Sequence, residues 1–145
     1  MRVLLIDAKP KLALALAAHS DVHVGLLPLQ PVYPEIMDGG IPTWPYHWGR
    51  KLSPSAVWQV RRAIKEFQPD LVHPFFSRPL SHTLLAVAGW RRRPKVVSSR
   101  GITRDLSRLD PGNWISYLHP GVDAYGCVSE AVRESLVRSG IAPSR

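Results

Sequence analysis

The sequence predicts an α/β fold built on a parallel β-sheet with helices on both faces. Apolar runs typical of buried strands alternate along the chain with segments of helical periodicity. Such alternation favours a parallel sheet, because parallel neighbours need a crossover connection that is usually a helix. The expected strands are residues 2–6, 22–27, 70–73, 95–101 and 123–128; the expected helices are residues 11–18, 54–67 and 80–88 and a last helix between Ser129 and Gly140.

The length and composition fit one globular domain that spans residues 1–145. A chain of 145 residues that is 45% apolar buries roughly two-thirds of its unfolded surface in one core. Its 19 Lys and Arg residues against 11 Asp and Glu give a net charge of +8, which favours anionic partners. Cys127 is the single cysteine, so an internal disulfide is excluded and a reducing cytoplasm fits best. The sequence shows neither a signal peptide nor an apolar run of about 18 residues that would span a bilayer.

Local signals define the ends of two helices and one long loop. Ser53-Pro54 suits the N-cap and first position of the second helix, and Gln68-Pro69 ends that helix. Ser129 suits the N-cap of the last helix, which Gly140 ends. Residues 28–52 are rich in Pro and Gly and are expected to form a loop without regular structure.

Aromatic and basic residues of this loop and the following helix predict a surface that contacts an anionic membrane. Tryptophan rings prefer the lipid headgroup layer, and the same combination also suits stacking on sugar or base rings. The alternative is a loop folded over the core with its aromatic rings buried. The expected membrane contacts are Trp44, Trp48, Arg50, Lys51, Arg61, Arg62 and Lys65.

Polar side chains follow three of the predicted strands, at the sheet edge where parallel α/β proteins bind ligands. An imidazole, hydroxyl groups and an Arg fork at this edge could hold a hydroxylated or anionic ligand. The alternatives are a half-buried, hydrogen-bonded His73, a solvated turn around Arg100 and an N-cap role that accounts fully for Ser129. The expected ligand-binding residues are His73, Ser77, Arg78, Arg100, Gly101, Arg104 and Ser129.

Several chemistries are excluded by missing motifs. The sequence has no Gly-x-Gly-x-x-Gly fingerprint, no P-loop, no His-Glu-x-x-His and no Gly-x-Ser-x-Gly. Without the glycine fingerprint no dinucleotide cofactor is expected. The six histidines are scattered, so no metal site is expected. The first strand leads into Lys9 and Pro10 without an acidic pocket, which disfavours a receiver-like signalling domain.

The order of these segments resembles the amino-terminal domain of family 4 glycosyltransferases, which have the GT-B architecture. The resemblance is carried by Pro69–His73, Ser77-Arg78, Lys95–Gly101 and Val122–Arg133. It implies a Rossmann-like half-domain that binds the acceptor, while a carboxy-terminal domain binds the nucleotide-sugar donor. In the family, that second domain follows the segment after Gly140.

Two departures from the family pattern affect the mechanism. Asp7–Pro10 does not supply the Gly-rich turn that many members carry after the first strand. Arg100 stands where many members have His, and Arg cannot act as a base, although it can hold a phosphate or offset leaving-group charge.

The resemblance therefore implies the acceptor-side domain of a retaining glycosyltransferase that transfers sugar to a lipid-linked or polysaccharide acceptor. We expect residues 1–145 to be inactive alone and to need a carboxy-terminal domain or a separate partner chain. The nucleotide sugar would be a substrate, and no cofactor is expected. The alternative is a non-catalytic module that binds an anionic glycan, a membrane surface or nucleic acid. No RNA-binding signature supports the nucleic-acid alternative, so no nucleic-acid partner is expected. The expected location is the cytoplasm, peripheral on the inner face of the plasma membrane.

Overall fold

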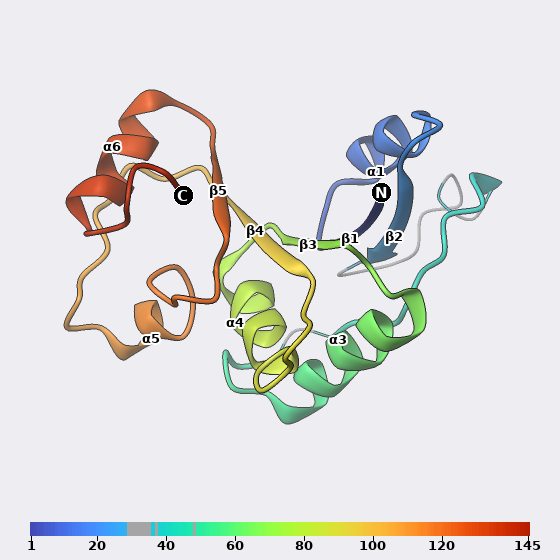
Figure 1. The fold of residues 1–145 in the computed structure, drawn as a ribbon, viewed down its shortest axis with the longest axis horizontal. Helices are drawn as coiled ribbons and strands as arrows, with labels where there is room; N and C mark the ends of the chain where they lie inside the picture. Colours follow the sequence, from blue (N-terminus) through green and yellow to red (C-terminus); the bar gives the residue numbers. More distant parts are fainter. Residues whose placement is uncertain (29–35, 37, 48) are drawn as a thin grey trace.

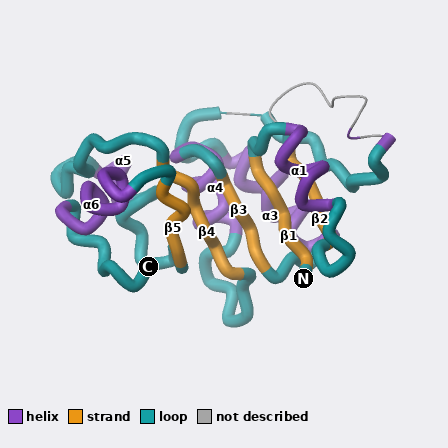
Figure 2. The backbone as a smooth tube through the Cα atoms, turned by 90° about the horizontal axis from the view of Figure 1, so that it is seen from above, coloured by secondary structure: helices purple, strands orange, loops and turns teal. Residues whose placement is uncertain are grey.

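Five parallel strands form one sheet in the order β2-β1-β3-β4-β5 (Figures 1 and 2). The computed structural model describes residues 1–28, 36, 38–47 and 49–145. The strands are β1 (Arg2–Ile6), β2 (His23–Leu27), β3 (Leu71–Pro74), β4 (Lys95–Arg100) and β5 (Ala124–Cys127). The predicted parallel sheet is therefore confirmed, with each strand within about two residues of its predicted bounds.

Helices cover both faces of this sheet, as predicted. Figure 1 shows α3 and α4 on one side of the sheet and α1 and α6 on the other. The helices are α1 (Pro10–Ala17), α3 (Pro54–Phe67), α4 (Ser77–Ala86), α5 (Pro111–Trp114) and α6 (Glu130–Arg138). The short helix α5 is not among the predicted helices; at its start the Asp110 carboxylate accepts a hydrogen bond from the Gly112 amide (2.8 Å).

Strand β1 is buried on both faces because alternate side chains enter different layers of the core. Leu4 and Ile6 pack in a cluster with α3 and α4, whereas Val3 and Leu5 pack in a second cluster with residues of α1 and β2. Burial of each such side chain stabilises the fold by about 1.5–3 kcal/mol. Two-sided burial explains why the first strand reads as a continuous apolar run.

The predicted helix caps are present at both ends of α3 and α6. The Ser53 hydroxyl accepts a hydrogen bond from the Ala56 amide (3.5 Å), and the Ser129 hydroxyl accepts one from the Val132 amide (3.4 Å). Gln68 ends α3 in the left-handed conformation, with a φ of 48°. Gly140 follows α6 with a φ of 91°, a conformation that glycine adopts without a steric cost.

Every strand ends at the same edge of the sheet. The chain passes from β2 on one side of β1 to β3 on the other, so the strand order reverses between β1 and β3. The register places Ile6 beside Pro74 and Arg100 beside Cys127 at this edge. Ligands of open α/β sheets bind at the carboxyl ends of the strands near such a reversal.

Asp123 joins the segment before β4 to the start of β5. Its carboxylate accepts hydrogen bonds from Arg93 (2.6 Å), Lys95 (3.3 Å) and the Val96 amide (2.8 Å). Partial burial alone would raise the pKa of this carboxyl, but the three donors outweigh it and lower the pKa to about 2. This carboxylate therefore fixes the outer strands in position.

Asp123→Ala is expected to lower the free energy of unfolding by about 1–2 kcal/mol at neutral pH, because three donors lose their acceptor. Since the folded pKa is depressed, the stabilisation is complete above the ordinary carboxyl pKa near 4 and is lost as the pH falls toward about 2. Urea titrations across this range measure it. Asp105→Ala, which removes an exposed ion pair with Arg138, is the control and should cost less than about 0.5 kcal/mol. Equal effects of the two substitutions would contradict the prediction.

Candidate functional site at the carboxyl edge of the sheet

Two adjoining cavities lie at the carboxyl ends of β3 and β4. We name them by their chemistry: the basic cavity, of about 340 Å³, is lined by Lys51, Arg104, Asp105 and Asp110, among others. The apolar cavity, of about 460 Å³, is lined by Phe75, Phe76, Arg78 and Gly101, among others. Ser77, Arg100, Ile102 and Tyr117 line both.

Arg100, the last residue of β4, lines both cavities and is only 7% exposed. Its guanidinium lies 4.9 Å from the centre of the Tyr117 ring and donates a hydrogen bond to the carbonyl of Arg104. Its buried Nε has no hydrogen-bond partner within the described part of the chain. Burial lowers the pKa of this guanidinium, yet an arginine keeps its charge at any physiological pH.

The basic cavity has an excess of positive charge. Lys51 reaches it from the loop before α3 and donates a hydrogen bond to the carbonyl of Gly112 (2.8 Å). The two carboxylates that line it have other partners, since Asp105 pairs with Arg138 (3.1 Å) and Asp110 caps α5. Among the described residues, no carboxylate lies within ion-pair distance of Lys51 or Arg100. An anion is therefore the ligand that the charges of this cavity favour.

The apolar cavity has an exposed hydrophobic rim. Phe76 is 52% exposed and Ile102 is 65% exposed, although both follow buried strands. Ser77 begins α4 beside them, so the positive end of the α4 dipole is directed toward the same region. The site thus combines a cationic part with an apolar part.

The structure brings five of the seven expected ligand-binding residues together. Ser77, Arg78, Arg100 and Gly101 line the apolar cavity; Arg104 lines the basic one, as do Ser77 and Arg100. Sequence order alone does not show this, because these residues come from the ends of two different strands.

His73 and Ser129 lie outside the lining of both cavities. His73 is hydrogen-bonded through Nε2 to the hydroxyl of Ser99 (2.8 Å), and its ring stacks on Phe75 at 4.3 Å. Burial lowers the pKa of His73, so its imidazole is neutral at physiological pH. Ser129 is exposed and caps α6, the role that its sequence position already explained.

The aromatic loop is folded over the core at the positions that the structure describes. Trp44 donates a hydrogen bond to Glu66 (2.7 Å) and packs edge-on against Phe67. Tyr46 is 2% exposed and shares a hydrogen bond with Nδ1 of His82 (2.7 Å). Of the remaining expected membrane contacts in this loop, Arg50 is exposed, Lys51 lines the basic cavity, and Trp48 lies outside the described residues.

The basic residues of α3 lie on its outer surface. Arg62 pairs with Glu66 (2.6 Å) and lies over the ring of Trp58, which is 61% exposed. Arg61 lies over the Trp90 ring at 5.0 Å and donates to the carbonyl of Ala86. The α3 surface therefore combines cations with an exposed tryptophan that the sequence analysis did not single out.

Asp7 is a candidate site residue that sequence reasoning missed. It directly follows β1, at the point where the strand order reverses, and has a φ of 60°, which is uncommon for a residue other than glycine. Burial raises its pKa to about 6. Burial also raises the pKa of Tyr46, and the negative charge of Asp7 adds to that rise. An Asp after the first strand was the available signal, but its backbone conformation and partial burial depend on tertiary packing.

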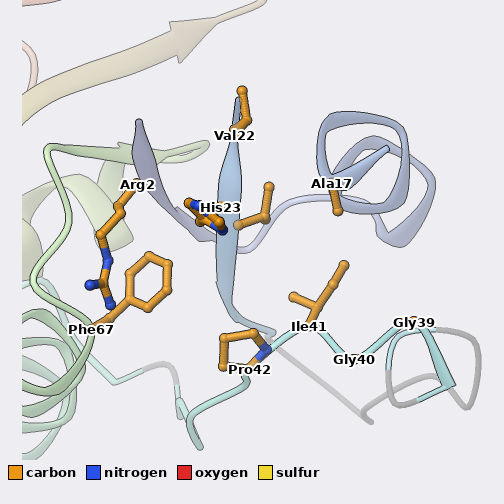
Figure 3. Close-up of a pocket in the computed structure, with 10 residues that line it drawn as sticks. Arg2, Ala17, Val22, His23, Gly39, Gly40, Ile41, Pro42 and Phe67 are labelled. Carbon is orange, nitrogen blue, oxygen red and sulfur yellow. The ribbon is translucent and has the colours of Figure 1, made fainter. Parts of the chain in front are cut away.

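A third cavity, of about 430 Å³, lies at the opposite edge of the sheet (Figure 3). Arg2 and His23, the first residues of β1 and β2, line it together with Phe67 and Ile41. The Arg2 guanidinium lies over the Phe67 ring at 4.7 Å. This cavity is therefore separate from the strand ends where the expected site lies.

The described residues include no group of three His, Cys, Asp or Glu side chains placed to hold a metal ion. None of the described helices has the length and apolar character needed to cross a bilayer.

The model of Glycosyltransferase Family 4 matches residues 11–145, which is most of the sequence and includes both cavities. The chain belongs to this family. Comparison with curated proteins finds no match.

Solved structures share the fold of this family 4 domain at low sequence identity. A lipopolysaccharide outer core galactosyltransferase, WaaB, aligns with a TM-score of 0.62 at 13% identity, over 99% of this chain and 43% of WaaB. Anabaena HepE, in complex with UDP, aligns with a TM-score of 0.64 at 16% identity, over 99% of this chain and 42% of HepE. The UDP-GlcNAc 2-epimerase of Methanocaldococcus jannaschii aligns with a TM-score of 0.64 at 12% identity, over 99% of this chain and 44% of the epimerase. The chain thus spans less than half the length of these proteins and has the fold of one GT-B half-domain.

Asp7→Asn is expected to raise the free energy of unfolding by about 1 kcal/mol at neutral pH, a value reduced because the side chain is partly exposed. The folded pKa is raised to about 6, so the folded state is penalised progressively as the pH rises from about 4 to about 6. Below about pH 4 the carboxyl is protonated in both states and the gain disappears. Asn also tolerates the left-handed backbone.

Urea titrations at neutral pH and below about pH 4 measure the effect of Asp7→Asn on the free energy of unfolding. Asp21→Asn, at an exposed carboxylate, is the control. A gain of equal size at acidic and neutral pH would show that the charge of Asp7 is not its cause.

Proposed function

We propose that this chain is the acceptor-side domain of a glycosyltransferase that transfers sugar from a nucleotide-sugar donor to a lipid-linked or polysaccharide acceptor. The observation that carries the proposal is the pair of cavities at the strand ends of a family 4 domain. Their shared wall contains a hydroxyl, an aromatic ring and a buried guanidinium, which suit a glycan with a charged or apolar attachment. The donor would bind mainly to a second domain, carried by the same protein or by a partner chain.

This division of the site predicts that residues 1–145 alone transfer no sugar. Incubation of the purified domain with radiolabelled nucleotide sugars and a lipid extract tests it, with the complete two-domain protein as the positive control. Robust transfer by residues 1–145 alone would contradict the division. If the complete protein transfers nothing but the domain binds the lipid or glycan fraction, the chain is a non-catalytic binding module.

In the complete enzyme, Arg100→Ala is expected to lower turnover about 100-fold, the range typical of a lost charge-stabilising group. The domain should remain folded, because the replaced side chain has no carboxylate partner among the described residues. Arg133→Ala, on the exposed surface of α6, is the matched control. Unchanged kinetics with an intact melting curve would remove Arg100 from the site.

We further propose that the domain works in the cytoplasm, at the inner face of the plasma membrane, with the outer surface of α3 against the anionic headgroups. Three cations, Arg61, Arg62 and Lys65, accompany the exposed ring of Trp58 on this helix. Basic residues near an anionic surface contribute about 1 kcal/mol each, and tryptophan favours the headgroup layer. Because Trp44 packs on Phe67 and Lys51 lines the basic cavity, the proposal rests on α3 and not on the loop.

The double variant Arg62→Glu with Lys65→Glu is expected to weaken binding to phosphatidylglycerol vesicles by about tenfold or more at low salt. Vesicle sedimentation measures the bound fraction, with phosphatidylcholine vesicles for comparison. The charge-matched control is Arg133→Glu with Arg138→Glu on α6. Equal losses in both double variants would indicate a net-charge effect and would contradict a specific α3 surface.

A further inference from the structure

We propose that the basic cavity binds the phosphoryl group of a phosphate ester and that the apolar cavity beside it binds the hydrocarbon part of the same molecule. This inference rests on the proposed function and deepens it, because it specifies an amphiphilic phosphate as the acceptor class. It follows from the charge of Arg100, the groups that converge beside it and the shared wall of the two cavities.

Arg100 carries a charge in a place where an unpaired charge is costly. A buried cation is normally paired with a carboxylate or fully hydrogen-bonded. Arg100 is 7% exposed and contacts one carbonyl and one aromatic face. Among the described residues no carboxylate lies within ion-pair distance of it, Asp105 acts on it only from farther away, and its Nε lacks a hydrogen-bond partner. An anion bound in the cavity would supply the missing acceptor.

Other positive groups converge on the same cavity. Lys51 is held in place by its hydrogen bond to the carbonyl of Gly112. Arg104 is exposed, and its carbonyl accepts a hydrogen bond from the guanidinium of Arg100. Ser77 contributes a hydroxyl and the positive end of α4. These groups come from three separate segments, so their convergence is a product of the fold.

A phosphoryl group matches this arrangement better than a carboxylate does. It carries up to two negative charges and three terminal oxygens, which suit several cations around one cavity. A planar carboxylate has two oxygens and one charge, and would leave the cations of Lys51, Arg100 and Arg104 only partly compensated.

The apolar cavity indicates what the phosphate is attached to. Phe76 and Ile102 are more than half exposed, and together with Phe75 and Tyr117 they form a hydrophobic lining that meets the basic cavity at Arg100. Exposed apolar side chains gathered in a cavity typically bind apolar ligand groups. A ligand that crosses Arg100 would therefore place its phosphate on one side and its hydrocarbon on the other.

Isothermal titration of residues 1–145 with inorganic phosphate, hexyl phosphate and uridine diphosphate tests the proposal and distinguishes a lipid-type source from a nucleotide source. We expect hexyl phosphate to bind at least about tenfold more tightly than inorganic phosphate, because its chain enters the apolar cavity. Arg100→Gln should weaken the binding of inorganic phosphate and of hexyl phosphate by about tenfold or more. Phe76→Ser, at a residue that lines the apolar cavity and not the basic one, should weaken binding of hexyl phosphate alone.

Arg133→Gln, which removes one exposed cation outside both cavities, is the control and should change each affinity by less than about twofold. Thermal melts establish that each variant is folded, and Lys51→Gln provides the same test if Arg100→Gln does not fold. The proposal is overturned if phosphate does not bind, if Lys51 and Arg100 variants bind it normally, or if uridine diphosphate binds tightly while the hexyl chain adds nothing. Hexyl phosphate binding without transferase activity in the complete protein would retain this site and refute the proposed function.

Discussion

The arrangement of the molecule depends on the hydrogen bonding of five strands in one direction. A parallel pair cannot be closed by a tight turn, so each strand is followed by a crossover that covers one face of the sheet. Two consequences follow from this single constraint. Strands β1 and β2 are buried on both sides, and the carboxyl ends of all five strands meet at one edge. Residues as distant in the sequence as Asp7, Ser77 and Arg100 therefore belong to one region of the molecule.

A buried hydrogen-bonded pair connects the loop before α3 to helix α4. His82, buried on α4, donates from Nε2 to the carbonyl of Arg50 (2.8 Å), since a carbonyl only accepts. Its Nδ1 must then accept the hydrogen bond from the Tyr46 hydroxyl (2.7 Å). Burial lowers the pKa of His82, in keeping with this neutral imidazole. The two bonds hold the loop over α4, and this position places Lys51 next to the basic cavity.

The site that results has an uneven distribution of charge. The carboxylates that line the basic cavity are engaged by Arg138 and by the first turn of α5. Arg100 contacts a carbonyl and a ring, and no carboxylate of the described residues lies within ion-pair distance of it. Asp123 shows the opposite case, because its carboxylate accepts hydrogen bonds from three donors within the domain. Arg100 and Asp123 thus differ in how far the described residues compensate their charges.

The sequence by itself determined the strands, the caps at Ser53 and Ser129 and the edge of the sheet where the candidate site lies, because apolar periodicity and capping are local properties of the chain. Tertiary structure decided which polar residues meet there. His73 is hydrogen-bonded to Ser99, and Trp44 packs against Phe67. Lys51, which the sequence suggested as a membrane contact, lines the same cavity as Arg100. The partial burial of Asp7 and the unpartnered Nε of Arg100 also depend on contacts between distant segments, which periodicity and spacing do not encode.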